Sequence, residues 1–286
     1  MKITALVVTY NRVEWLKKNM KALLSQSRLP DEILVVDNAS TDSTSEFLSD
    51  LQKKEKIVTV KRLNENLGGS GGFSRGLKEA IDRGADWVWM MDDDALPYRN
   101  SLEELEKYIK KFDQDESTGA LLSKLVKIPN AIPKEKTSLA RIGTFVGFTV
   151  SAKTVKKVGL PDEGFFIYAD DYEYSVRIRH HGLKLIKIHS SLIEHKDWIR
   201  QKRMFRFPFS KPAIPSWKVY YIFRNALNAT RESKFIYTVL KGYFFIDRYI
   251  WAYVSPQTKP YAFHGFEDGI HGVKGKVVDP RHPKWK

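Results

Sequence analysis

The sequence predicts an α/β protein in which a mostly parallel sheet is flanked by helices. Short, unbroken apolar runs rich in Val and Ile alternate with helical patterns through the first third of the chain. Unbroken runs are typical of strands covered on both faces, and strand–helix alternation predicts right-handed crossovers in a parallel sheet. The chain has 286 residues and is 42% hydrophobic, so it can bury a sizeable core, and bulk disorder is excluded.

The first third of the chain contains the clearest elements. Strands are expected at 3–9, 32–37, 57–63 and 87–91. The helix expected at about 13–26 has an apolar stripe formed by Leu16, Met20, Leu23 and Leu24. Further helices are expected at about 43–53 and 72–83, so every pair of successive strands is joined by a helix.

The later elements are less regular. A helix is expected at 101–112, and strands are expected at 120–127, 141–150 and about 183–193. The first two of these strands are separated by a loop that contains Pro and Lys, and a further helix is expected to start at Asp170. From about Lys196 the composition becomes aromatic and basic. We therefore divide the chain into an α/β domain at 1–199 and a C-terminal helical region at 200–286.

Polar residues follow the first four strands directly. They form the segments Thr9–Arg12, Asp37–Asn38, Asn64–Asn66 and Asp92–Asp94. In an open α/β sheet the crevice at the carboxyl ends of the strands is where ligands bind. We therefore expect these segments to converge on one edge of the sheet and to form a site there.

Asp92, Asp93 and Asp94 give the strongest local signal. Three adjacent carboxylates after a buried strand repel one another, and a bound cation or many hydrogen-bond donors would relieve that cost. Oxygen ligands of this kind suit Mg²⁺ or Mn²⁺, which also accept phosphate oxygens. The alternative interpretation is a solvated acidic loop.

The glycine-rich segment Gly68–Gly72 is expected to precede a helix, where backbone amides could cradle a phosphate. It has neither the spacing of a phosphate-binding GxxxxGK[ST] loop nor that of a GxGxxG dinucleotide fingerprint. A simple flexible turn is the alternative.

Asp170 and Asp171 open a helix after the apolar turn 164–168. A carboxylate in partly apolar surroundings can act as a general base toward a hydroxyl group. Carboxylates in a first helical turn also stabilise the helix, which is the alternative role. His195 ends a strand, and taken by itself it would be an ordinary hydrogen-bonded histidine.

Composition indicates where in the cell the protein is expected, but it does not identify the class of binding partner. The 48 Lys and Arg residues exceed the 34 Asp and Glu residues by 14, which fits nucleic acid, phosphate-bearing substrates or an anionic membrane surface. The absence of cysteine excludes disulfides and thiolate chemistry. With no signal-peptide pattern at the N-terminus, a cytoplasmic location is expected. The apolar stretch 235–254 contains Lys241, Asp247 and Arg248 and is not expected to span a membrane.

The segment from Trp198 to Phe209 mixes aromatic and basic residues. Such a mixture fits a membrane interface, where rings insert shallowly and cations meet anionic lipid. It also fits single-stranded nucleic acid, and core packing would explain the aromatic residues alone.

Five motifs occur in a recognisable order: VVTYNR, VVDNASTD, NLGGSGG, MDDDA and GFFIYADDYEYSVR. In this order they resemble family 2 glycosyltransferases with the GT-A fold, whose sheet binds a nucleotide. The longer run NLGGSGGFSRG, WMMDDDA and YADDYEY, followed by His195-Lys196-Asp197-Trp198, is similar to galactofuranosyltransferases and their rhamnosyltransferase relatives.

The resemblance implies a role for each matching residue. Thr9, Arg12 and Asp37 would bind the uridine end of the nucleotide. The nucleotide-sugar site as a whole comprises Thr9, Arg12, Asp37, Asn66, Gly69, Asp92 and Asp93. Asp92, Asp94 and His195 would bind a divalent cation, Mn²⁺ or Mg²⁺.

The resemblance also implies an inverting reaction. Asp171 would act as the catalytic base, Asp170 would assist it by placing the acceptor, and Trp198 would also contact the acceptor. The expected reaction moves galactofuranose from UDP-galactofuranose to a bacterial surface polysaccharide, such as O-antigen or capsule, or to its lipid-linked precursor. We expect the enzyme to contact the inner face of the cell membrane peripherally and to bind no nucleic acid. The alternatives are a rhamnosyltransferase that uses dTDP-rhamnose and, in a different class, a basic nucleic-acid-binding protein.

Overall fold

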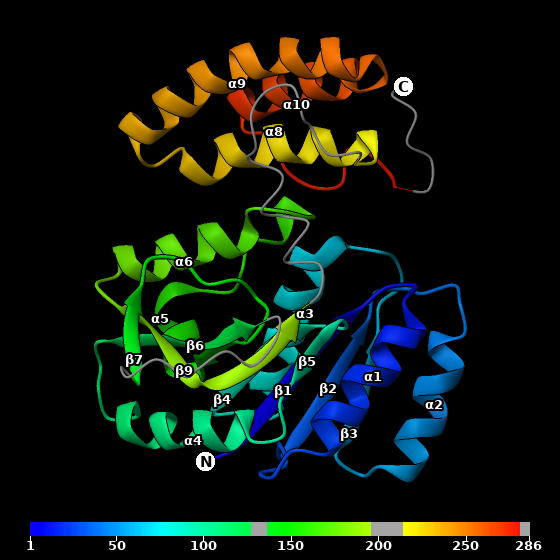
Figure 1. Cartoon of the computed structure of the whole chain (residues 1–286), viewed down its shortest axis with the longest axis vertical. Coiled ribbons are helices and arrows are strands. Elements are labelled where there is room, and N and C mark those ends of the chain that lie inside the picture. Colours follow the sequence, from blue (N-terminus) through cyan, green and yellow to red (C-terminus); the bar gives the residue numbers. More distant parts are fainter. Residues whose placement is uncertain (127–135, 196–213, 281–286) are drawn as a thin grey trace.

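The computed structural model describes residues 1–126, 136–195 and 214–280, and it has two parts (Figure 1). The lower part in Figure 1 is an α/β domain with a central twisted sheet, and the upper part is a layer of three long helices. The helical layer lies over the edge of the sheet at which the parallel strands end. Its described helices are α8 (Ser216–Thr230), α9 (Lys234–Val254) and α10 (Lys259–His271).

The sheet has the strand order β3-β2-β1-β4-β8-β6-β9-β5, and β7 pairs with β9 outside that path. Strands β1 to β4 are parallel, as the sequence predicts, and span Ile3–Thr9, Glu32–Asp37, Val58–Arg62 and Trp87–Asp92. The remaining strands are β5 (Ala95–Pro97), β6 (Thr118–Val126), β7 (Thr137–Ala140), β8 (Phe148–Ser151) and β9 (Lys184–His195).

Helices cover both faces of this sheet. On one face α1, α2 and α4 contribute Leu16, Leu48 and Leu105 to a core cluster, and on the other α3, α5 and α6 contribute Leu77, Val155 and Ile178 to a second cluster. The bounds of these helices are Val13–Leu24, Thr44–Lys54, Gly68–Asp82, Ser101–Phe112, Ala152–Val158 and Asp170–His180 for α1 to α6 in order.

Helix α3 starts at Gly68 and not near residue 72, so the prediction that the glycine-rich segment precedes the helix is wrong. The glycines form the first turns of α3. A Cβ on Gly72 would lie 2.5 Å from Val8 Cγ1, and one on Gly76 would lie 2.5 Å from Leu6 Cδ1. The close approach of α3 to β1 therefore requires glycine and outweighs its poor helix propensity.

The strand expected at 141–150 is mostly wrong. Strand β8 begins at Phe148, after a turn in which Gly147 has a φ of 81°. Strands β5 and β7 and helix α5 were not expected, because elements of three to seven residues carry too little periodicity to be distinguished from loops.

The C-terminal helical layer has its own core around Tyr220, Phe223 and Trp251, which also includes Phe166 from the α/β domain. Among the helices that the structure describes, none is both long and apolar enough to cross a membrane. The predicted domain boundary at 199/200, Trp198 and the aromatic and basic segment 198–209 all lie outside the described residues.

Candidate active site

The carboxyl ends of the parallel strands bring the predicted residues to one edge of the sheet. Thr9 pairs in register with Asp37 where β1 and β2 end, and Asp92 pairs with Val8 where β4 ends. His195 is the last residue of β9 and pairs with Ala95 of β5, directly after the aspartate triplet. The antiparallel pairing of β5 with β9 therefore brings together residues that are about a hundred positions apart in the chain.

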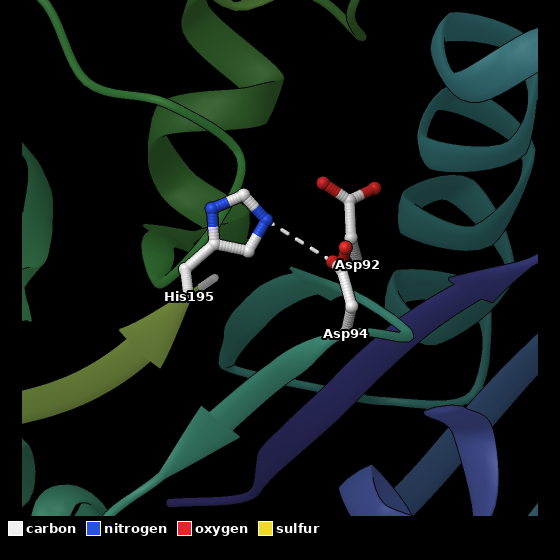
Figure 2. A group of neighbouring side chains, drawn as sticks. All are labelled: Asp92, Asp94 and His195. Carbon is white, nitrogen blue, oxygen red and sulfur yellow. Dashed lines mark hydrogen bonds and ion pairs between the residues drawn. The ribbon is translucent and has the colours of Figure 1, made fainter. Parts of the chain in front are cut away.

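Asp92, Asp94 and His195 form a group whose ligand atoms all lie within 4.8 Å of one another (Figure 2). His195 Nε2 lies 3.1 Å from Asp94 Oδ1, the pair that the dashed line marks in Figure 2. His195 and Asp94 are buried, and Asp92 is partly buried. Two carboxylates and one imidazole are ligands that a divalent cation accepts while leaving positions for phosphate oxygens.

The electrostatics of this group favour a cation. Burial, followed by repulsion from Asp94 and Asp93, raises the pKa of Asp92 to about 8. Burial also opposes the ionisation of Asp94, yet the hydrogen bond with His195 and the charge of Arg12 hold the pKa of Asp94 below its usual value. A divalent cation would relieve the repulsion and keep both carboxylates ionised, so the residues present fit such an ion.

Asp93 contacts the end of β1 and the loop after it. Thr9 Oγ1 donates a hydrogen bond of 2.7 Å to Asp93 Oδ2, and Arg12 Nη1 lies 3.2 Å from Asp93 Oδ1. Arg12 Nη2 also donates to Asp94 Oδ2 at 2.8 Å. Burial raises the pKa of Asp93 to about 6, although Arg12 and Thr9 oppose that rise. Arg12 thus ties the segment after β1 to two of the three aspartates.

Asp37 is buried at the end of β2 and faces the loops on either side of it. Its Oδ1 accepts from the backbone N–H of Ser40 at 2.9 Å, and its Oδ2 lies 3.3 Å from Arg62 Nη1. Ser40 Oγ in turn accepts from the backbone N–H of Asn11, which has a φ of 53°. These contacts fix the two loops that follow β1 and β2.

Asn66 and Gly69 lie where α3 begins. Asn66 Oδ1 accepts from Gly68 N–H at 2.8 Å, while Asn38 accepts from Leu67 N–H and donates to Gly68 O. Gly69 is open, because a Cβ there would have no described atom within 4 Å. Asn38 was placed at this edge by the sequence but was not chosen as a site residue.

Asp170 and Asp171 start α6 after a turn with unusual backbone geometry. Phe166, Tyr168 and Ala169 have φ values of 65°, 67° and 64°, a region that non-glycine residues rarely adopt. Burial and then the neighbouring Asp170 raise the pKa of Asp171 to about 7. Asp170 also raises the pKa of Asp92, so the acidic helix start lies within electrostatic reach of the aspartate triplet.

The turn before α6 accepts hydrogen bonds from the helical layer and from the start of α3. Asn225 Nδ2 donates to the carbonyl oxygens of Phe165, Ile167 and Tyr168 at 2.9, 2.6 and 3.0 Å. Arg224 Nη2 donates to Phe165 O at 2.9 Å, and Ser70 N–H of α3 donates to Phe166 O at 3.2 Å.

Arg224 and Asn225 are fully buried in α8, and the sequence interpretation missed them. The available signal was a charged and an amide residue inside the apolar run YYIFRNALNA. Buried polar residues of this kind require hydrogen-bond partners, and backbone carbonyls of a nearby turn supply them.

Comparison with known proteins identifies the family and the fold class of this chain. A family model described as glycosyl transferase family 2 matches residues 4–159. Galactofuranosyltransferase GlfT1 of Mycolicibacterium smegmatis is 30% identical over 203 residues, which cover 63% of this chain and 66% of that protein. GlfT1 of Mycobacterium tuberculosis H37Rv is 29% identical over 201 residues, with the same coverage of both chains. The match thus spans just under two thirds of each relative.

Two solved structures illustrate a likeness in fold that covers most of this chain. The mannosyltransferase PcManGT from Pyrobaculum calidifontis, in complex with GDP-Man and Mn²⁺, has a TM-score of 0.60 at 17% identity and covers 94% of this chain and 75% of its own. S. aureus TarS 1-349 in complex with UDP has a TM-score of 0.57 at 16% identity and covers 95% of this chain and 89% of its own. These likenesses confirm the predicted GT-A fold class.

Proposed function

Because the chain belongs to glycosyl transferase family 2 and is a glycosyltransferase, we propose that it transfers galactofuranose from UDP-galactofuranose, with inversion, to a bacterial glycan or lipid-linked glycan. The observation that carries the proposal is that the ligand atoms of Asp92, Asp94 and His195 lie within 4.8 Å of one another, and that Asp170, which starts α6, is near enough to raise the pKa of Asp92. This arrangement supports the proposal of a cation site with a carboxylate base near it.

The proposed cation is Mn²⁺ or Mg²⁺, held by Asp92, Asp94 and His195. When bound, the ion stabilises the negative charge that develops on the diphosphate leaving group. Arg12 and Thr9 hold Asp93 at 3.2 and 2.7 Å, which keeps the aspartate triplet in place. In this proposal Asp92 and Asp94 therefore face the diphosphate while Asp93 fixes the loop after β1.

The other nucleotide contacts follow the same edge. We assign the uridine end to Thr9, Arg12 and Asp37. Thr9 and Asp37 end β1 and β2, and Arg12 lies in the loop after β1. Asn66 and Gly69 lie along the donor at the start of α3, where backbone N–H groups and the helix dipole attract phosphate. The openness of Gly69 leaves room for the donor to approach the backbone.

Asp171 is the proposed base. It accepts the proton of the acceptor hydroxyl while that hydroxyl attacks the anomeric carbon from the side opposite the leaving diphosphate, which inverts the configuration. A pKa of about 7 suits this role, because the carboxylate is then basic enough to take a proton and still largely ionised slightly above neutral pH. Asp170 places the acceptor, and Trp198 is proposed to contact it.

We propose galactofuranose as the donor sugar because the two GlfT1 relatives are named as galactofuranosyltransferases. The test is a panel of nucleotide sugars, including UDP-galactofuranose and dTDP-rhamnose, incubated with Mn²⁺ and simple glycoside acceptors and analysed by product mass. The proposal predicts a product that carries one added hexose from UDP-galactofuranose. A product formed from dTDP-rhamnose alone would replace it with the rhamnosyltransferase alternative.

A further inference from the structure

Helix α9 exposes large apolar side chains to solvent and buries two charged ones. Large apolar side chains on it are exposed to solvent: Phe235, Ile236, Val239, Tyr243, Phe245, Ile246, Tyr249, Tyr253 and Val254. The exposed fractions of Phe235 and Tyr253 reach 79% and 82%. The exposed charged residues of α9 are Lys234 and Lys241. We call this set the α9 outer face.

The inner side of α9 buries two charged residues beside two aromatic ones, whereas the inner side of a surface helix is normally apolar. Phe244, Asp247, Arg248 and Trp251 are buried and recur at the helical spacing of three and four residues. Arg248 Nη1 lies 3.1 Å from Glu267 Oε1 of α10, and its guanidinium lies 4.5 Å from the centre of the Phe266 ring. A charge turned inward with apolar residues turned outward is the pattern of proteins that face lipid.

Net charge is concentrated in the same part of the chain. Residues 200–286 contain 17 Lys and Arg residues but 5 Asp and Glu residues, a net charge of +12 out of +14 for the whole chain. Anionic lipid headgroups attract basic residues close to the surface, and apolar and aromatic side chains then insert at the boundary with the acyl chains. A face shared between two copies would instead be depleted of lysine and would bring two strongly positive regions together.

The position of α9 leaves this face accessible. In Figure 1, α9 runs along the side of the helical layer that points away from the sheet, while α8 lies on the side nearest the sheet. Docking through α9 would therefore place the membrane on the side of the helical layer opposite the edge of the sheet that carries Asp92. Because Asn225 of α8 holds the turn before Asp170, the layer that would dock is also the layer that shapes the site.

We propose that the α9 outer face docks on the anionic surface of a membrane, with the helix lying in the plane of the interface. Apolar burial by residues such as Ile246 and Tyr253 supplies one part of the affinity, and attraction of the basic C-terminal region to the headgroups supplies the other. Docking does not depend on transfer, but its use rests on the proposed function, since it would bring the enzyme to a lipid-linked acceptor.

The experiment is co-sedimentation of the full chain with phosphatidylcholine vesicles that contain either no anionic lipid or about 30% phosphatidylglycerol, at about 50 mM and about 500 mM salt. The test variant carries Phe235→Ser, Val239→Ser, Ile246→Ser and Tyr253→Ser. The matched control carries Leu29→Ser and Leu139→Ser, which alter exposed apolar residues of the α/β domain with exposed fractions of 48% and 73%. Far-UV circular dichroism and Mn²⁺-dependent UDP binding check that each variant folds.

Wild type and control should bind the anionic vesicles and lose affinity at high salt, while the test variant should bind at least about tenfold more weakly. Wild type that fails to sediment with anionic vesicles at low salt would overturn the proposal, as would a test variant that binds as well as wild type. A concentration-dependent dimer that the test variant abolishes, with vesicle binding unchanged, would assign the face to a second copy instead. Since Mn²⁺-dependent UDP binding is read separately, failure of docking is distinguishable from failure of the proposed function.

Discussion

The proposed metal half of the site, Asp92, Asp94 and His195, is held by strand ends and side-chain pairs. The proposed acid-pair half, Asp170 and Asp171, is held through the backbone of the turn before it. In the metal half, sheet register brings the residues together and Arg12 and His195 balance the carboxylates. In the acid-pair half, a turn with three positive φ values is fixed by Arg224 and Asn225 of a distant helix. The first half thus depends on topology, and the second depends on packing between the two parts of the molecule.

Loss of the base should have the largest effect. Asp171→Asn should lower the transfer rate about 10²- to 10⁴-fold, because the amide cannot accept the acceptor's proton. Mn²⁺-dependent UDP binding should stay near the wild-type value, since the metal half is untouched. Steady-state transfer assays and calorimetric titration with UDP measure the two properties. Asp82→Asn, an exposed carboxylate on α3, is the matched control, and substantial remaining turnover in Asp171→Asn would remove that residue from its role.

Loss of a proposed metal ligand should lower both UDP binding and transfer. Asp94→Ala removes a carboxylate that lies 3.1 Å from His195, and it should weaken Mn²⁺-dependent UDP binding at least about tenfold and lower transfer with it. Calorimetric titration with and without Mn²⁺ gives the measurement. Asp50→Ala, an exposed residue on α2, should change neither property. An unchanged Mn²⁺ effect in Asp94→Ala would place the cation elsewhere.

Removing the hydrogen bonds that Asn225 donates to the turn before α6 should affect the acid-pair half of the site and leave the other half unchanged. Asn225→Ala leaves the carbonyl oxygens of Ile167 and Tyr168 without their shared donor, which should cost about 1–3 kcal/mol of unfolding free energy. Transfer should fall while Mn²⁺-dependent UDP binding is kept, because the turn carries Asp171 and not the metal ligands. Asn228→Ala removes a single hydrogen bond to Val273 O, away from that turn, and serves as the control. Equal loss of transfer and UDP binding in Asn225→Ala would argue for general unfolding.

The pH dependence should be the smallest effect. The pKa of Asp92 is raised to about 8 in the folded, metal-free protein, so the group favours folding at low pH, and that stability is lost as the pH rises through about 8. In the presence of a chelator the melting temperature should therefore fall between about pH 6 and about pH 9, and Asp92→Asn should flatten the decline. Mn²⁺ should restore more stability at the higher pH, where the carboxylates are ionised. A melting curve of Asp92→Asn with the same pH dependence as wild type would contradict this reading.

The position of the aspartate triplet could be predicted from the sequence, because parallel strands end at a common edge. Once β1, β2 and β4 are recognised from their buried runs, Thr9, Asp37 and Asp92 must lie near one another. His195 was located by resemblance, and the three-residue strand β5 that pairs with its strand is too short to predict.

The acid-pair half could be predicted only in part. Asp170 and Asp171 were chosen correctly as the start of a helix, but the left-handed conformations of Phe166, Tyr168 and Ala169 leave no periodic pattern in the sequence. Their cause lies in contacts with Arg224 and Asn225, about sixty residues away, and such tertiary contacts are not encoded in local propensity. The glycines of α3 were misread for the same reason, since packing against β1 decides their conformation.

The most direct test is anomalous diffraction from a crystal soaked with Mn²⁺ and UDP. We expect one manganese peak within about 2.5 Å of carboxylate oxygens of Asp92 or Asp94 and of an imidazole nitrogen of His195, in contact with the diphosphate and on the side that faces Asp171. A manganese peak bound to UDP but remote from all three side chains would contradict it.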